Sequence, residues 1–289
     1  MTGGYPHADI GLQRPGVSRG LIDVFEHRYL LTLIVRKEVQ IRYRGSVLGW
    51  LWSYVKPLVQ FAVFFVALGV FLRLSNSIDA YPLYLLAGMT VISFFTEAFA
   101  NGTRSLVDNA PLIKKIYVPR EMFPVSSMIV AAINTLPQMI VVGIIAAVLG
   151  WQPTALGVAA ILLGFVIVAV LSTALGMLFG AINVSFRDAQ SFVDIIVMCA
   201  VWASPVMYQL SMVRSTLPDW AFTLYLLNPL TPAVELFHYG FWAPLDTSGS
   251  DQLPELWLFA GIAVVTSVIL LFVGQLVFRR LEGRFAQVL

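Results

Sequence analysis

Six long apolar stretches constrain the possible folds of this chain more than any other feature of its sequence. Each approaches the roughly 20 residues that a helix needs to cross the ~30 Å hydrocarbon core of a bilayer. Their approximate bounds are residues 53–74, 82–100, 123–149, 155–182, 192–210 and 256–278. Since 58% of the 289 residues are hydrophobic and only 12% are charged, the composition excludes an ordinary soluble domain. The sequence predicts an all-α integral membrane protein with six transmembrane helices.

Basic residues are unevenly distributed between the two sides of these predicted spans. With the N-terminus inside, the chain up to Lys56 holds eight lysine and arginine residues, the second-to-third connection four, the fourth-to-fifth connection one and the C-terminal end three. Only Arg73 and Arg214 fall on the other side. Because cytoplasmic segments of membrane proteins carry this excess of positive charge, we expect both termini to be cytoplasmic.

The chain before the first span divides into a polar tail and a basic, helical segment. Residues 1–20 contain glycine and proline and lack the apolar core of a signal peptide, so we expect a flexible cytoplasmic tail, with residues 21–289 forming a single membrane domain. In residues 21–52 one helical face carries apolar side chains and predicts an amphipathic helix at the membrane interface, with a solvated basic linker as the alternative. That face carries Leu30, Leu33, Ile34, Ile41 and Leu48.

The stretch that leads into the first span is both basic and aromatic. It reads Arg-Tyr-Arg-Gly-Ser-Val-Leu-Gly-Trp-Leu-Trp-Ser-Tyr-Val-Lys-Pro from Arg42 to Pro57. Tryptophan and tyrosine rings settle at the level of the lipid headgroups, and basic side chains are attracted to anionic lipid. We therefore expect Arg42, Arg44 and Lys56 to lie at the cytoplasmic interface, where they can meet lipid phosphates.

The connection between the second and third spans predicts a very short helix. Asp108 or Asn109 can cap it, Pro111 suits its first turn, and Pro119 ends it. One or two turns in which apolar residues stand beside Lys114 and Lys115 would protrude at the cytoplasmic surface. Such a protrusion predicts a partner protein with a matching socket.

Two of these motifs together resemble the ABC-2 family of transporter permeases. They are the Arg-Tyr-Arg-Gly-Ser-x-Leu-Gly-x-x-Trp block that begins at Arg42 and the Asn109–Pro124 connection. The resemblance covers essentially the whole chain and is closest to the branch that exports polysaccharide, O-antigen and teichoic acid, in particular actinobacterial galactan export permeases. It implies a bacterial cytoplasmic membrane protein that homodimerises and works with two copies of a separate ATPase. The implied cargo is a polyprenyl-diphosphate-linked glycan.

The resemblance also assigns a role to the short helix between the second and third spans. In the family this connection supplies a coupling helix, which sits in a groove of the ATPase subunit. Residues 109–120 match that position. The residues that the resemblance marks for ATPase coupling are Asn109, Pro111, Leu112, Lys114, Lys115, Tyr117, Pro119 and Arg120.

Motifs for catalysis or metal binding are absent from the sequence. No G-x-x-x-x-G-K-[ST] phosphate loop occurs, so we expect a permease without enzymatic activity of its own, for which ATP and Mg²⁺ bind to the partner ATPase. The three histidines are far apart, and Cys199 has no second cysteine to pair with, so no metal site or disulfide is expected and Cys199 is interpreted as a small buried apolar residue. Nothing indicates a nucleic-acid partner.

The external connection between the fifth and sixth spans contains an apolar, aromatic run from Trp220 to Trp242. Asn228-Pro229 and Pro232 interrupt it, and neither half is long enough to span. We expect two short helices that form a re-entrant hairpin in the outer leaflet. Aromatic side chains near this end can pack against sugar rings along an exit path, or they can form an ordinary interfacial belt. These residues are Trp202, Tyr208, Trp220, Tyr225, Phe237, Tyr239 and Trp242.

Two acids, Glu97 and Asp194, lie within apolar stretches. A charge at the bilayer centre costs about 2.5–3.5 kcal/mol on insertion scales, so these acids are expected to face protein or water. Pairing with Arg104 or Arg187 is favoured over a proton relay. Gly176 and Gly180 in the fourth span indicate close helix packing.

Three other functions remain open from the sequence. The same motifs would suit an exporter of drugs or other small molecules. An ion-coupled secondary transporter would need no ATPase and would use Glu97 or Asp194. A membrane-embedded enzyme is the least favoured, because the carboxylates of the largest loop are scattered along the sequence.

Overall fold

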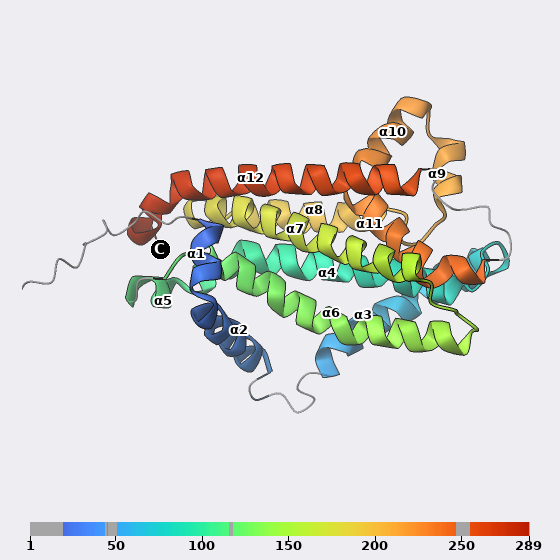
Figure 1. The fold of residues 1–289 in the computed structure, drawn as a ribbon, viewed down its shortest axis with the longest axis horizontal. Helices are drawn as coiled ribbons and strands as arrows, with labels where there is room; N and C mark the ends of the chain where they lie inside the picture. The colour runs from blue at the N-terminus through green and yellow to red at the C-terminus, as the bar shows by residue number, and fades with distance from the viewer. Residues whose placement is uncertain (1–19, 44, 46–50, 116–117, 247–254, 289) are drawn as a thin grey trace, which may run out of the picture.

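The computed structural model describes residues 20–43, 45, 51–115, 118–246 and 255–288, and all of the regular secondary structure in these residues is helical. Four long helices lie side by side along the longest axis of the molecule (Figure 1). They are α4 (Tyr81–Asp108), α6 (Met122–Val148), α7 (Ala155–Ser185) and α12 (Leu256–Val288). The predicted second, third, fourth and sixth spans therefore correspond to single continuous helices.

The predicted first span, 53–74, is built from two helical segments. α3 (Trp52–Phe64) is an α-helix, and η2 (Phe65–Phe71) continues it as a π-helix. Together they supply an apolar segment, Tyr54–Phe71, of spanning length. One part of its apolar side chains, including Leu58, Val63 and Val70, is exposed on the single chain, as expected for a helix face toward lipid or a second subunit. Another part packs against the core, namely Phe61, Phe64, Phe65 and Leu68.

The predicted fifth span, 192–210, is shorter than expected. Its helix, α8 (Ala189–Trp202), has 14 residues and so extends roughly 21 Å, less than the ~30 Å of the hydrocarbon core. Beyond Trp202 the chain leaves the helix, because Pro205 supplies no N–H and the hydroxyls of Tyr81 and Tyr84 hold the Met207 and Pro205 carbonyls at 3.0 and 3.1 Å. Among the described residues, five segments rather than six are long and apolar enough to cross a membrane.

The predicted interfacial helix over residues 21–52 is interrupted in its described part. The structure has α1 (Leu21–Glu26) and α2 (Arg28–Tyr43), which are separated at His27. The His27 imidazole bonds the Asp23 carbonyl at 2.9 Å, a local contact that competes with helix continuation. Ile34 is buried on α2, whereas Leu33 and Ile41 are exposed, and Leu48 lies outside the described residues.

Close contact between α4 and α7 depends on glycine. A Cβ atom at Gly102 would lie 3.2 Å from the Cα of Gly176, and one at Gly180 would lie 3.2 Å from the Gly102 carbonyl oxygen. The Asn183 amide donates to the Thr103 carbonyl across the same contact, at 3.1 Å. The prediction that Gly176 and Gly180 permit close helix packing is confirmed.

One end of the bundle carries α1, α2, the short helix α5 (Ala110–Lys115) and the C-terminal part of α12 (Figure 1). We call it the α5 end. A separate apolar cluster joins these elements to the neighbouring ends of α4, α6 and α7. Its buried members include Val24, Ile34, Leu106, Phe123, Met177, Phe278 and Phe285.

The opposite end carries the segment between α8 and α12. It comprises α9 (Leu210–Thr216), α10 (Asp219–Leu227), α11 (Leu230–Phe237), η4 (His238–Trp242) and η5 (Ala243–Leu245). We call this end of the molecule the α10 end. The expected break between two short helices occurs at Asn228-Pro229. Pro232 does not break the chain, because it lies in the first turn of α11, where its missing N–H would have no partner within the helix. Every residue of α11 is buried, and α11 packs on α7, α4 and α12.

Candidate functional site

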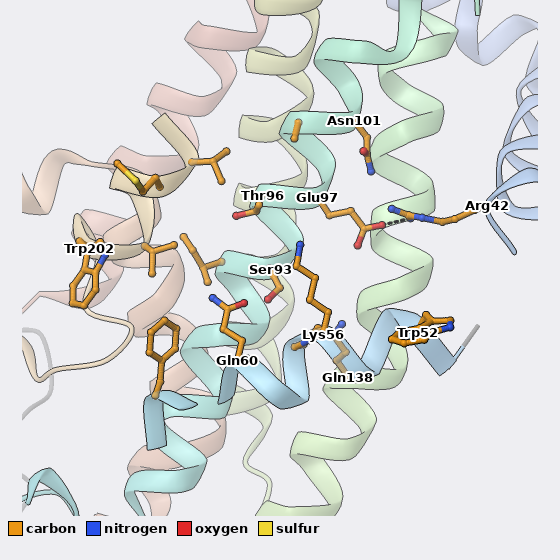
Figure 2. Close-up of a pocket in the computed structure, with 17 residues that line it drawn as sticks. Arg42, Trp52, Lys56, Gln60, Ser93, Thr96, Glu97, Asn101, Gln138 and Trp202 are labelled. Atoms are coloured by element: carbon orange, nitrogen blue, oxygen red, sulfur yellow. Dashed lines mark hydrogen bonds and ion pairs between the residues drawn. The ribbon is translucent and has the colours of Figure 1, made fainter. Parts of the chain in front are cut away.

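A groove of about 860 Å³ opens between α2, α3, α4, α6 and α8 (Figure 2). Its volume lies within the range of small-molecule binding sites. Both polar and apolar side chains line it. The polar ones are Arg42, Lys56, Gln60, Ser93, Thr96, Glu97, Asn101 and Gln138, and the aromatic ones are Trp52, Phe64 and Trp202.

Arg42 and Glu97 form an ion pair at one side of this groove (Figure 2). The side chains are 34% and 23% exposed, so the pair is partly screened by solvent and contributes about 1 kcal/mol or less. The Asn134 amide of α6 also donates to the Glu97 carboxylate, at 2.7 Å. Glu97 therefore pairs within the protein, as expected, although its partner is Arg42 rather than Arg104 or Arg187.

Lys56 lies in the same groove, while Arg44 lies outside the described residues. Figure 2 shows the Lys56 side chain extending from α3 toward the part of α4 that carries Ser93 and Glu97. Within the part of the chain that the structure describes, Lys56 has no hydrogen bond or ion pair. The groove thus combines one cation that is already paired with one that remains available to a ligand.

Asp194 has a different environment from Glu97. It lies on α8, where Arg104 of α4 approaches its carboxylate at 3.6 Å and Gln190 donates to it at 3.0 Å. Asp194 and Arg104 are about half exposed. Of the two partners considered from sequence, Arg104 is the one that the structure pairs with this acid.

The short helix predicted after the second span is present as α5. Pro111, Lys114 and Lys115 are exposed, and Leu112 and Ile113 pack against the apolar cluster at the α5 end. A partner that binds the exposed side of α5 would therefore press on a helix that is anchored to this cluster. Tyr117 lies outside the described residues.

Three other residues assigned to this connection make contacts within the chain. Asn109 is buried, accepts a hydrogen bond from Lys37 of α2 at 2.6 Å, and donates to the Ser105 carbonyl at 2.9 Å. Pro119 is buried. Arg120 pairs with Glu282 and stacks over the Phe285 ring at 5.7 Å. Their positions connect the α5 region to α2 and α12.

A second polar contact at the α5 end attaches α2 to α6. The Ser126 hydroxyl of α6 donates to the Glu38 carboxylate at 2.9 Å. Burial raises the pKa of Glu38 above its ordinary value of 4.5, although the Ser126 hydrogen bond and the charges of Lys37 and Arg42 act in the opposite direction.

The aromatic residues near the α10 end fall into separate groups. Phe237 and Trp242 are each 1% exposed and belong to the main core, where the Trp242 indole donates to the Asp79 carbonyl at 2.6 Å. Trp202 and Trp220 are exposed, and Trp202 lines the groove. Tyr208, Tyr225 and Tyr239 are partly buried.

Tyr208 and Tyr225 face each other. Their hydroxyls are 3.4 Å apart, and burial raises the pKa of Tyr225 above its ordinary value.

A buried pair at the α10 end escaped the sequence analysis. His238 and Glu235 are almost completely inaccessible, with Nδ1 of the imidazole 3.3 Å from Oε1 of the carboxylate. The imidazole stacks on the Tyr84 ring at a centroid distance of 3.8 Å, and its Nε2 lies 3.2 Å from the Tyr84 carbonyl. The three-residue spacing of Glu235 and His238 within a predicted helix was the sequence signal that could have identified this pair.

No cluster of three or more metal-ligating side chains occurs in the described part of the chain. Cys199, expected to be buried, is instead exposed on α8. Its apolar surroundings in the sequence reflect a helix face that the single chain leaves uncovered.

Comparisons with known proteins agree with this architecture. Residues 29–242 match the family described as ABC-2 type transporter. The chain is 27% identical to the O-antigen export system permease protein RfbA of Klebsiella pneumoniae over 263 residues, which cover 90% of this chain and 95% of that protein. It is 28% identical to the protein of the same name from Myxococcus xanthus over 272 residues, or 92% and 97% of the two chains.

Proposed function

This chain belongs to the ABC-2 type transporter family, and from that premise we propose that it is the transmembrane subunit of an ATP-driven polysaccharide exporter. The proposed cargo is a polyprenyl-diphosphate-linked glycan, either a cell-wall galactan or an O-antigen-like chain. The O-antigen export permeases of Klebsiella pneumoniae and Myxococcus xanthus support a polysaccharide cargo, because the similarity extends over at least 90% of this chain.

The groove is the structural observation that carries this proposal. A lipid-linked glycan needs cations for its diphosphate, an apolar surface for its lipid and polar side chains for its sugars. Arg42 and Lys56 supply the first, and the groove also contains apolar residues of α3 and α8 and several hydroxyl and amide side chains. The exposed apolar faces of α3 and α8 on either side of it would allow a lipid chain to enter laterally.

The proposed orientation places the α5 end in the cytoplasm of a bacterial cell and the α10 end outside. Basic side chains at the α5 end support this assignment, including Lys37, Lys114, Lys115, Arg120 and Arg279. Cytoplasmic segments are enriched in such residues. Both termini would then be cytoplasmic, and the α10–α11 pair would form the re-entrant hairpin at the exit.

We further propose that two copies of the chain assemble with two copies of a separate ATPase. One chain leaves the groove open, so a second copy is needed to enclose a path for a glycan. In this assembly ATP and Mg²⁺ bind only to the ATPase subunits. Closure of the ATPase pair would move the two α5 helices, and their apolar anchors would transmit that movement to α2, α4 and α12.

Transport in proteoliposomes tests the proposal directly. A labelled lipid-linked glycan is supplied to the permease alone and to the permease with its ATPase, with and without ATP. We expect translocation only when both proteins and ATP are present. ATP hydrolysis with movement of small drugs but not of glycan would instead identify a small-molecule exporter, and gradient-driven uptake by the permease alone would identify an ion-coupled transporter.

The phosphate-binding role of the groove can be tested in the same assay. Charge reversal by Arg42→Glu and Lys56→Glu should strongly reduce glycan transport, because a diphosphate would then face repulsion at the entrance. Arg214→Glu on α9, at the other end of the molecule, serves as the matched control. Unchanged transport and substrate binding in both groove variants would refute the assigned role.

A further inference from the structure

Glu97, the acid that pairs with Arg42, bears on how the groove binds an anion as directly as the two cations do. We propose that Arg42 and Lys56 form the binding site for the diphosphate of a lipid-linked substrate and that Glu97 occupies Arg42 as an internal competitor until this substrate arrives. The inference rests on the proposed function for the identity of the lipid. It names Glu97 as the competitor and therefore predicts whether each substitution strengthens or weakens substrate binding.

The geometry of the ion pair favours an exchangeable contact. Arg42 comes from α2, outside the spans, whereas Glu97 comes from α4 within the bundle, and 55 residues separate them in sequence. Both side chains are partly exposed and line the groove. A ligand that enters the groove can therefore reach the guanidinium without first unfolding any part of the core.

Charge favours a diphosphate over the carboxylate at this position. Guanidinium groups bind carboxylates and phosphates through the same planar pair of N–H donors, so the two anions compete for one surface of Arg42. Among the described residues that line the groove, Arg42 and Lys56 are the only cations and Glu97 is the only acid. A diphosphate carries more negative charge than one carboxylate and has enough oxygens to engage Lys56 as well.

The released acid would retain a partner. Asn134 is 1% exposed, and its amide donates to Oε1 of Glu97 at 2.7 Å. A carboxylate that loses its cation in a partly buried position is costly unless other donors remain. Asn134 comes from α6 and not from α2, so Arg42 can leave while Glu97 stays hydrogen-bonded.

Binding of farnesyl diphosphate, a short polyprenyl diphosphate, tests the exchange. The permease–ATPase complex is placed in nanodiscs of zwitterionic phospholipid and titrated at low salt. We expect Arg42→Gln and Lys56→Gln each to weaken binding about tenfold and to reduce its salt dependence. Glu97→Gln should tighten binding roughly three- to tenfold, because removal of a partly exposed ion pair frees the guanidinium.

The double variant distinguishes competition from general electrostatics. If Glu97 acts by occupying Arg42, Glu97→Gln has nothing to release in an Arg42→Gln background, and the tightening should disappear. Asp194→Asn is the matched control. Asp194 lies on α8, pairs with Arg104 of α4 and does not line the groove. Tightening by Asp194→Asn of the same size, or tightening that persists without Arg42, would overturn the proposal.

Two further ligands identify the source of the phosphate. Farnesol, which lacks the diphosphate, should bind weakly and without response to Glu97→Gln. Inorganic pyrophosphate should bind more weakly than farnesyl diphosphate, and equal affinities would overturn the assignment to a lipid-linked substrate. Every phospholipid of the nanodisc carries a phosphodiester, so the titrated ligand must compete with these lipids for the groove. Binding that is detected there therefore reflects a preference for the ligand over ordinary phospholipid.

The outcome is separable from that of the proposed function. Glutamine retains the size of Glu97 and an acceptor for Asn134, and the thermal transition of each variant reports whether it folds. Glycan transport by the wild-type complex combined with an unchanged affinity in Glu97→Gln would refute only the competitor. Absence of glycan transport combined with the expected binding changes would refute the cargo and leave the anion site standing.

Discussion

Gly102 has almost no room for a side chain, because the Cα of Gly176 lies 3.2 Å from where its Cβ would be placed. We expect Gly102→Val to destabilise the protein by about 1–3 kcal/mol, since α4 and α7 would have to separate. Gly261→Val on α12 is the control, because no side chain and no other part of the protein beyond the local backbone of its own helix lies within 4 Å of the Cβ position there. Thermal unfolding in detergent measures both, and equal transition temperatures would contradict the packing argument.

Glu38 gives a prediction about pH at the same scale. Burial raises its pKa in the folded protein, so folding favours the protonated form. The corresponding stability is fully present below the ordinary carboxyl pKa of 4.5 and is lost as pH rises through the raised value. Glu38→Gln should therefore raise the transition temperature at pH 7 and have little effect at pH 4.

The exposed acid Asp188 provides the comparison for this pH test. Asp188→Asn should leave the difference between the two pH values unchanged. If Glu38→Gln destabilises the protein equally at both pH values, the Ser126 hydrogen bond at 2.9 Å requires the carboxylate, and the burial argument fails.

At the scale of elements, α5 offers a partner few side chains. Lys114 and Lys115 are exposed, while Asn109, Pro119 and Arg120 are engaged or buried within the chain. We expect Lys115→Glu to weaken association with the ATPase severalfold, because it reverses a charge on the proposed contact surface. Arg187→Glu, an exposed charge reversal in the α7–α8 connection, should not. Co-purification of the two subunits measures both changes.

The bounds of the long helices could be predicted from sequence to within a few residues at most ends. The predicted stretches 123–149 and 155–182 correspond to Met122–Val148 and Ala155–Ser185. The second and sixth predicted stretches stop short of the true helix ends at Asp108 and Val288. These helices continue beyond their apolar segments, where the α5-end cluster supports their last turns.

The fifth stretch shows what hydropathy cannot distinguish. Residues 203–209 continue the apolar pattern, but the structure uses them as an irregular segment whose carbonyls are bound by Tyr81 and Tyr84. An apolar residue buried in an irregular segment has the same hydropathy as one buried in a helix. Only the tertiary contacts separate the two cases.

At the scale of the whole molecule, the exposed apolar faces of α3 and α8 predict where a second copy binds. Cys199 lies exposed on α8 and is the only cysteine of the chain. If two copies meet across the groove, a short bis-maleimide should link Cys199 to Cys199 of the partner subunit and give a dimer band in membranes. Cys199→Ser should abolish the band. Absence of the band in active wild-type complexes would exclude α8 from the interface.

The sequence by itself determined the class of this protein and the position of most of its helices. Apolar runs of spanning length must form helices in a bilayer, because a backbone surrounded by lipid can satisfy its hydrogen bonds only internally. Proline and asparagine likewise marked α5 and the break before α11, since both act through local backbone geometry.

Only the tertiary structure decided which polar groups meet. Arg42 and Glu97, Lys37 and Asn109, and Arg120 and Glu282 are separated by 55, 72 and 162 residues. No local pattern encodes such pairs, because they depend on how whole helices pack. For the same reason the sequence did not separate Phe237 and Trp242, which complete the core, from Trp202 and Trp220, which remain exposed.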